Sequence, residues 1–140
     1  MLIGITGTRS MLNASQKDRI QKFLQNYYTH GSELHHGDCI GADAEVADIA
    51  KRLGYKIICH PPIKNELRAF HSSDLTNVPQ SYFARNRAIV DQTEHLIVAP
   101  FQDEWQPNGG TWYTHDYAKK KNKPLTIFYP NILSLWDKLA

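Results

Sequence analysis

The sequence predicts an α/β fold, a Rossmann-like three-layer sandwich with a mainly parallel sheet of about five strands. Short, continuously apolar runs alternate with amphipathic helical stretches along the chain, a pattern typical of parallel strands that helices cover on both faces. The 140 residues show no internal repeat, low-complexity tract or change of composition. A chain of this length can bury a substantial core, so we expect residues 1–140 to form one domain.

Three strands are predicted in the first half of the chain. The first spans residues 2–6 within "MLIGIT", and a helical stretch follows from about Ser15 to Tyr28. The second strand is "ELHH" and the third lies within "YKIICH". The helix between them has one apolar side, formed by Val46, Ala47, Ile49, Ala50 and Leu53. Right-handed crossovers through these helices would place the strands parallel in one sheet.

Two more strands are predicted in the second half. A polar segment that contains proline, from Pro61 to Pro79, separates them from the first three. A helix near Ser81 to Gln92 precedes the fourth strand, "HLIVAP", and a helix near Gly110 to Lys121 precedes the fifth, "PLTIFY". The final stretch, "NILSLWDKLA", is expected to form a C-terminal helix.

The charge balance gives no reason to expect a polyanion as the partner. Lysine and arginine number 16 against 14 aspartates and glutamates, a formal net charge of +2, so any affinity for anions must be local. No apolar stretch approaches the roughly 18 residues of a membrane span, and the N-terminus does not resemble a signal peptide. Cys39 and Cys59 are too few for a disulfide framework. These features predict a cytoplasmic protein without a membrane partner.

Three loops rich in glycine follow predicted strands. They contain "GITGTRS", "HHGDCIGAD" and "NGGT", and each leads into a predicted helix. In a parallel sheet of this kind, ligands bind beyond the carboxyl ends of the strands. Glycines permit close approach of the backbone, and the amides at a helix start attract anions. The convergence of the loops predicts a phosphate or ribose site; tight turns that only need glycine are the alternative interpretation.

Four blocks of sequence, in order and covering nearly the whole chain, resemble the SLOG superfamily. They are "GITGTRS", "HHGDCIGADAEVADIAKRLGYKIICHPP", "YFARNRAIVDQTEHLIVAP" and "GGTWYTHDYAKKKNKPL". This Rossmann-like group includes the DNA-processing protein DprA and the LOG phosphoribohydrolases, and the chain is most similar to its small stand-alone YspA-like or YpsA-like domains. The blocks are specific for the superfamily and for none of its activities.

The resemblance implies a nucleotide or nucleotide-derived ligand across the sheet edge, with its phosphate on the glycine-rich helix starts. Arg9 and Arg85 can donate bidentate hydrogen bonds to a phosphate. Arg87 cannot share a helix face with Arg85, so only one of the two is expected to reach the site. Asp43 can accept ribose hydroxyls or cap its helix. The predicted ligand-binding residues are Gly7, Thr8, Arg9, Ser10, Gly37, Asp38, Gly41, Ala42, Asp43, Arg85, Asn86, Gly109, Gly110, Thr111 and Thr114.

A nucleotide N-glycosidase of the LOG type, which releases base and ribose phosphate, is the alternative function that the resemblance implies. LOG enzymes carry Pro-Gly-Gly-x-Gly-Thr followed by acidic residues, but the corresponding stretch here is "PNGGTWYTHDYA", without a glutamate after Gly-Gly-Thr. The candidates for a catalytic role are Arg85, Asp43 and Asp116, and they form no identified catalytic set. DprA-like binding of single-stranded DNA is a further alternative, which the near-neutral charge disfavours.

Aromatic and histidine side chains are further candidates for contacts with a ligand or a metal. Trp105 and Trp112 flank a long loop and are candidates to cover a base, whereas Tyr82 and Phe83 are expected to pack in the interior. The histidines include neither an HxxxH nor an HxH pair. The sequence therefore predicts no metal site, and it predicts no cofactor.

The favoured function is the binding of a nucleotide or nucleotide-derived small molecule by a sensor or sequestering domain. Nucleic acid is not the favoured partner. Self-association as a homodimer or a higher homo-oligomer is expected, because relatives commonly associate and the C-terminal run "ILSLW" exceeds what one small sheet covers.

Overall fold

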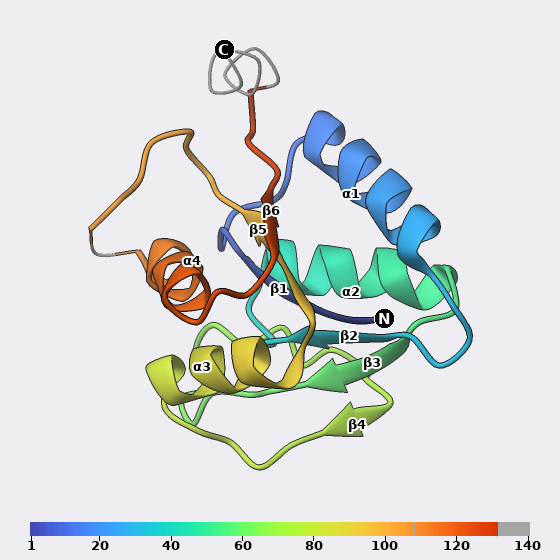
Figure 1. Cartoon of the computed structure of the whole chain (residues 1–140). Coiled ribbons are helices and arrows are strands. Elements are labelled where there is room, and N and C mark those ends of the chain that lie inside the picture. Colours follow the sequence, from blue (N-terminus) through green and yellow to red (C-terminus); the bar gives the residue numbers. More distant parts are fainter. Residues whose placement is uncertain (108, 132–140) are drawn as a thin grey trace.

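The computed structural model describes residues 1–107 and 109–131, which form a parallel sheet packed between helices (Figure 1). Within these residues the sheet has six strands in the order β4-β3-β2-β1-β5-β6, and every pairing is parallel. The strands are β1 (Leu2–Gly7), β2 (Glu33–His36), β3 (Lys56–Cys59), β4 (Leu75–Thr76), β5 (His95–Ala99) and β6 (Leu125–Ile127). The helices are α1 (Ala14–Tyr27), α2 (Ala42–Arg52), α3 (Tyr82–Gln92) and α4 (Gly110–Lys120).

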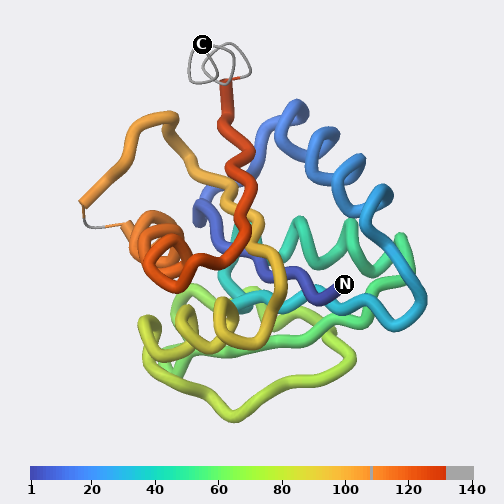
Figure 2. The backbone as a smooth tube through the Cα atoms, in the orientation of Figure 1, coloured from blue at the N-terminus to red at the C-terminus, as the bar shows by residue number. Residues whose placement is uncertain are grey.

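Helices cover both faces of the sheet, which is the middle layer of a sandwich (Figure 2). Ile3 and Ile5 of β1 pack with residues of α1 and α2 on one face. Leu96 and Val98 of β5 pack with residues of α3 and α4 on the other face. Successive side chains of a strand point to opposite faces, so one continuously apolar strand supplies both cores. The predicted three-layer α/β fold is confirmed.

The sheet has one strand more than the five expected. β4 is two residues long, both residues are exposed, and it pairs only with β3 at the edge of the sheet. It lies inside the polar segment from Pro61 to Pro79. A strand this short without a buried face leaves no apolar pattern in the sequence, so periodicity could not reveal it. The other described elements lie where expected, with small differences at their ends.

β1 lies in the interior of the sheet, between β2 and β5. Its register with β5 pairs Ile3 with His95 and Gly7 with Ala99, so the two strands end together. The loops that follow them leave the same edge of the sheet at adjacent positions, and the loop after β2 leaves that edge on the other side of β1. The strand order therefore brings the three glycine-rich loops together.

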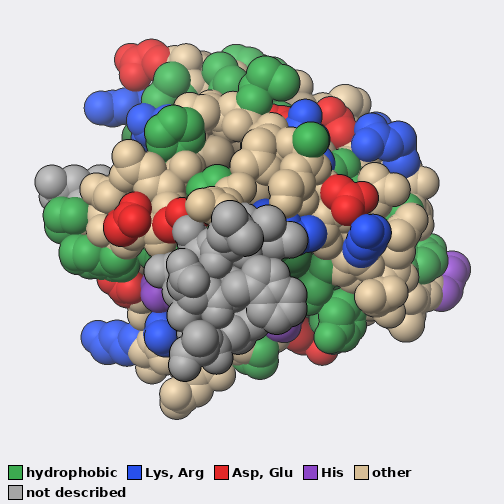
Figure 3. Space-filling view, turned by 90° about the horizontal axis from the view of Figure 1, so that it is seen from above, with side chains coloured by type: hydrophobic (Ala, Val, Ile, Leu, Met, Phe, Trp, Pro, Cys, Tyr) green, Lys and Arg blue, Asp and Glu red, His purple; other side chains and the backbone are tan. Residues whose placement is uncertain are grey.

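Two expectations fall on residues outside the described ranges. The C-terminal helix was predicted over residues 131–140 and the self-associating run "ILSLW" over 132–136, while the description ends at Asn131. Among the helices that are described, none combines the length and the apolar character needed to cross a bilayer. Acidic and basic side chains are interspersed on the face seen in Figure 3, in keeping with the net charge of +2.

Candidate functional site

A cavity of about 430 Å³ opens at the carboxyl edge of the sheet. Its wall combines the end of β1, the loops after β1 and β2, and the first turns of α3 and α4. Its volume and its position are typical of small-molecule sites in sheets of this type. The lining residues are Thr6, Gly7, Thr8, Arg9, Cys39, Asp43, Tyr82, Phe83, Arg85, Asn86, Gly109, Gly110 and Thr111.

Backbone contacts hold the loops after β1 and β5 to the start of α2. The Thr8 amide donates to the Ala99 carbonyl over 3.0 Å, and the Ala42 amide donates to the Thr8 carbonyl over 2.9 Å. A Cβ at Gly7 would lie 2.5 Å from the Ala42 Cβ and 2.7 Å from the Ala99 oxygen. Packing alone therefore requires glycine at position 7, and this glycine by itself is no sign of a ligand.

The start of α4 is different, because a Cβ at either of its glycines would clash with no neighbour. A Cβ at Gly110 would meet nothing nearer than the Asn86 side-chain nitrogen, at 4.0 Å. The N-cap residue, Gly109, supplies no side-chain acceptor, and the Gly110 and Thr111 amides have no acceptor among the described residues. The first turn of α4 carries no acidic residue. An open helix start of this kind favours an anion.

Arg85 of α3 places a positive charge in the cavity wall. Its side chain is part of a residue that is only 3% exposed, and it donates to the carbonyls of Gly37 and His60 and to Asn86 Oδ1. No described carboxylate lies within ion-pair distance of its guanidinium. The Asp43 carboxylate interacts with it electrostatically but makes no contact ion pair, so an anion in the cavity would be stabilised by this buried cation. Arg87 instead donates to the Tyr113 hydroxyl over 2.9 Å, so Arg85 is the one that reaches the site.

Asp43 braces the loop after β2. One oxygen of its carboxylate accepts the Gly37 amide at 2.9 Å and the Cys39 amide at 3.3 Å. Burial raises the pKa of this carboxyl to about 6, against the opposing effect of Arg85. The N-cap of α2 is Gly41, so the predicted capping role of Asp43 is wrong: it is the second residue of the helix and reaches back to the preceding loop.

Several predicted ligand-binding residues do not line the cavity. Asp38 is fully buried and accepts Arg68 Nε at 2.8 Å and the His71 amide at 2.9 Å, on the side of the 65–71 segment. The Thr114 hydroxyl donates to the Gly110 carbonyl, within its own helix. The positions outside the lining are Ser10, Gly37, Asp38, Gly41, Ala42 and Thr114.

The aromatic residues at the cavity are not the ones expected. Tyr82 and Phe83 both line it, and Phe83 is 53% exposed, so the prediction that it packs in the interior is wrong. The guanidinium carbons of Arg9 and Arg85 lie 5.9 and 5.5 Å from the Tyr82 ring centre. Both aromatics begin α3, just beyond the sheet edge, where a side chain need not enter either core. The position of the two residues in the sequence, at the start of a helix, predicts a place in the cavity wall better than apolar periodicity does.

The two candidate catalytic acids differ in their position relative to the cavity. Asp116 pairs with His115 Nδ1 at 2.8 Å and accepts the Trp105 indole N–H at 3.0 Å, and it does not line the cavity. Asp43 is the one carboxylate in the described lining; two amides bond to its Oδ2, and Oδ1 has no hydrogen-bond partner among the described residues. Trp105 is therefore turned to Asp116, whereas Trp112 is 5% exposed.

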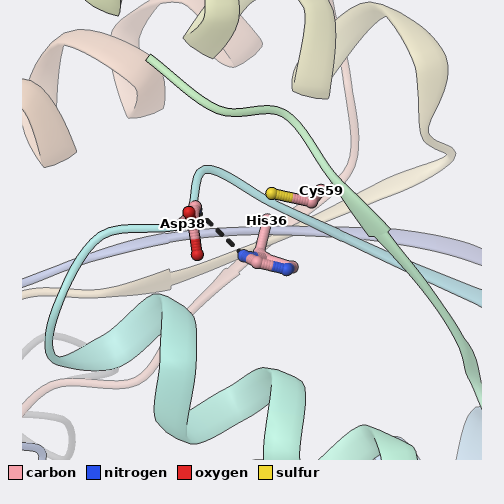
Figure 4. Close-up of side chains that lie close together, drawn as sticks. All are labelled: His36, Asp38 and Cys59. Atoms are coloured by element: carbon pink, nitrogen blue, oxygen red, sulfur yellow. Dashed lines mark hydrogen bonds between the residues drawn. The ribbon is translucent and has the colours of Figure 1, made fainter. Parts of the chain in front are cut away.

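The three side chains His36, Asp38 and Cys59 lie together beside the sheet, with possible ligand atoms within 4.8 Å of one another (Figure 4). His36 Nδ1 accepts the Asp38 amide at 2.9 Å, and Nε2 is 2.9 Å from Ser73 Oγ. Both Asp38 oxygens are occupied, and burial raises the pKa of the Cys59 thiol to about 12. Protein partners thus take up the ring nitrogens and the carboxylate, and hydrogen bonding explains the cluster.

A histidine pair lies behind Arg85. His35 Nδ1 and His60 Nε2 are 2.8 Å apart, and Glu33 is 2.8 Å from His35 Nε2. Burial lowers the pKa of His60 to about 4, so this ring is neutral at pH 7. The positive charge at the cavity is therefore that of Arg85 and Arg9.

No protein-family model matches the chain, and no curated protein matches it. Solved structures do match. A molybdenum cofactor binding protein from Rippkaea orientalis is 21% identical with a TM-score of 0.72, covering 99% of this chain and 83% of that one. The Moco carrier protein from Chlamydomonas reinhardtii is 21% identical with a TM-score of 0.68, covering 91% and 75%.

DNA processing protein A from Helicobacter pylori is 18% identical with a TM-score of 0.65, and the match covers 100% of this chain and 74% of that chain. Its structure is described as one of single-stranded DNA binding. At these identities the likeness concerns the fold. The chain thus has the Rossmann-like fold that the resemblance to the SLOG superfamily implied.

Proposed function

We propose that this chain binds a nucleotide or nucleotide-derived ligand, whose phosphate lies between the loop after β1 and the start of α4, and that it senses or sequesters this ligand. The observation that carries the proposal is the buried guanidinium of Arg85 in the wall of an open cavity, with no described carboxylate in ion-pair contact. An anionic group in the cavity could pair with it directly.

The start of α4 supports the same position for the phosphate. The Gly110 and Thr111 amides are free among the described residues, and the helix end adds a partial positive charge. Arg9 is exposed, lines the same cavity and brings a second cation. Two guanidinium groups and one helix start match the charge of a phosphate monoester better than that of a neutral ligand.

The aromatic side chains support a heterocyclic base as the rest of the ligand. Tyr82 and Phe83 line the same cavity as the two arginines, and more than half of the Phe83 surface is exposed. Stacking of a base on an aromatic ring contributes on the order of 1 to 3 kcal/mol.

Hydrolysis of an N-glycosidic bond and binding of single-stranded DNA are less well supported. General acid or base catalysis needs a carboxylate within reach of the ligand. In the described lining only Asp43 could serve, through the oxygen that the two amides leave open, and no second carboxylate accompanies it. DNA binding needs several cationic phosphate contacts, and the net charge is only +2. We therefore favour binding without turnover.

Calorimetry with the four common nucleoside 5′-monophosphates tests the proposal. At least one is expected to bind, and Gly110→Val and Arg9→Ala are expected to weaken its binding at least tenfold, by obstruction and by loss of charge. Arg52→Ala, which removes an exposed arginine at the far end of α2, is the matched control. Wild-type affinity in both site variants, or no binding at all, contradicts the proposal. Release of free base on chromatography would favour the hydrolase.

The molybdenum cofactor is a second candidate ligand, because two of the similar structures are described as proteins that bind or carry it. The test incubates the chain with the cofactor without oxygen, separates it by gel filtration and measures molybdenum by mass spectrometry. Co-elution that Gly110→Val abolishes supports this candidate. Molybdenum that elutes only with small molecules contradicts it.

Self-association is a separate proposal that depends on the apolar run at 132–136. Light scattering is expected to give a mass of at least twice 16.0 kDa. A mass of 16.0 kDa at high concentration would contradict it.

A further inference from the structure

A second cavity, of about 310 Å³, lies directly beside the first. It is lined mainly by the segment after β5 and by the start of α4. Of the residues special to it, Trp112 alone was predicted as a ligand contact, as a side chain that covers a base. Three residues, Thr8, Gly109 and Thr111, belong to both cavities. The remaining lining residues are Pro100, Phe101, Gln102, Gln106 and Trp112.

The shared residues are those assigned to the phosphate. Gly109 and the free Thr111 amide lie on the boundary, as does Thr8 of the loop after β1. The proposed anion position therefore lies between the two cavities rather than at the closed end of one. A ligand anchored there has room on both sides of its phosphate.

The second cavity has the chemistry of a base site. Phe101 is 64% exposed and Trp112 forms an apolar wall. Gln106 Nε2 donates to Gln102 Oε1 at 2.7 Å, which leaves the Gln102 amino group and the Gln106 oxygen without partners among the described residues. One free donor and one free acceptor on paired amides match the edge of a heterocyclic base, and an exposed phenylalanine offers a ring to stack on.

The two cavities are alike in that each offers an exposed aromatic ring. Each presents one phenylalanine that is more than half exposed, Phe83 in the first and Phe101 in the second. Each volume falls within the roughly 300 to 1,000 Å³ of ligand pockets. Two separate mononucleotides would bring two phosphates to one wall, where they repel each other. One phosphate linker shared by two bases avoids that repulsion and suits the two arginines.

We infer that the ligand is a dinucleotide: two base-bearing groups joined through a phosphodiester or a pyrophosphate, with the linker at Thr8 and Gly109 to Thr111. The inference rests on the proposed function and specifies its ligand. The second base lies against Phe101, with its edge toward Gln102 and Gln106.

Calorimetry compares each nucleoside 5′-monophosphate with its own dinucleotides, joined 3′,5′ by a phosphodiester or 5′,5′ by a pyrophosphate. At least one dinucleotide is expected to bind at least ten times more tightly than its mononucleotide. Phe101→Ala and Gln106→Ala, both at exposed positions, are expected to bring this ratio close to one. Phe70→Ala removes an equally exposed phenylalanine, 61%, that lines neither cavity, and it is expected to leave the ratio unchanged.

The outcomes separate the two proposals. Mononucleotide binding without a gain for any dinucleotide overturns the inference and leaves the proposed function standing. A gain that survives both Phe101→Ala and Gln106→Ala also overturns it, because the second group would then lie elsewhere. Absence of binding by every compound overturns the proposed function and the inference with it.

Discussion

The starts of α2 and α4 look alike in the sequence, since each follows a strand and each begins with glycine, yet they differ in what surrounds them. At α2, the Ala42 amide bonds to Thr8, and Ala42 fills the space that a side chain at Gly7 would need. At α4, a side chain at Gly110 would enter open space and the amide has no described acceptor. Gly7, at the end of β1, is required by its packing against the start of α2. Gly110, at the start of α4, leaves room for a ligand.

The two helix starts also differ in the charges that their own first turns carry. The first turn of α2 contains Asp43 and Glu45, whereas that of α4 contains no acidic residue. The positive end of α2 is thus compensated by its own side chains, and that of α4 is not. A glycine-rich helix start indicates an anion site only where both the space and the amides are unoccupied.

The largest difference is expected in stability. Gly7→Ala forces a Cβ against Ala42 and should lower the free energy of unfolding by about 2 to 3 kcal/mol. Gly110→Ala adds the same atom in open space, and its effect should stay within about 1 kcal/mol. Urea denaturation of the two variants and the wild type measures these changes in the free energy of unfolding. Equal losses would mean that the two glycines are not distinguished by packing.

Anions that bind at the start of α4 should stabilise the folded chain. Inorganic phosphate at ten times its dissociation constant should raise the free energy of unfolding by about 1.4 kcal/mol, because it binds only the folded chain. Gly110→Val should abolish this gain, whereas Arg52→Ala should keep it. Thermal unfolding with phosphate, and with chloride at equal ionic strength, is the measurement. The same gain in Gly110→Val would move the anion site away from α4.

The contribution of Asp43, at the start of α2, to the free energy of unfolding should depend on pH. The pKa of Asp43 is raised to about 6, so the folded chain binds a proton that the unfolded chain has lost between about pH 4 and 6. Over this window Asp43 makes stability fall as the pH rises. Asp43→Asn can still accept both amides, so at pH 7 it should be more stable than wild type by on the order of 1 kcal/mol, and near pH 3.5 the two should be similar. A constant difference across the range would assign the effect to packing.

The smallest effect is expected from a substitution that gives the start of α4 an acidic residue, as the start of α2 has. Thr111→Asp puts a carboxylate in the first turn of α4 and should raise the free energy of unfolding by about 0.5 kcal/mol while removing the stabilisation by phosphate. Thr111→Asn, of similar size and uncharged, is the control for the electrostatic effect on stability. If the aspartate variant responds to phosphate like wild type, the compensation of the helix end is not what excludes anions.

The fold could be predicted because both cores depend on apolar strands. The residues "LIVA" of "HLIVAP" are all apolar because alternate residues enter different cores, and that pattern can be recognised without knowledge of the tertiary structure. β4 could not be predicted, because two exposed residues carry no such pattern.

The site was predicted only as a set of neighbouring loops. Asp38 and Asp43 belong to one block, but Asp38 has a φ of 60° and directs its side chain to the 65–71 segment, while Asp43 faces the cavity. A backbone conformation of this kind is uncommon for aspartate and is not visible in the residue type. The difference between Gly7 and Gly110 likewise depends on what lies across from each, which only the assembled sheet determines.

Gln16 of α1 links three distant parts of the chain. Its side-chain nitrogen Nε2, in a residue 2% exposed, donates to the Pro100 carbonyl at 3.0 Å and to the Phe128 carbonyl at 2.9 Å. When α1 opens, the end of β5 and the residue after β6 lose this anchor together. Hydrogen exchange in α1 should therefore be coupled to exchange around residues 100 to 102, as one cooperative unit. A helix that contributes no residue to either cavity would then govern how long the rim of the second one stays formed.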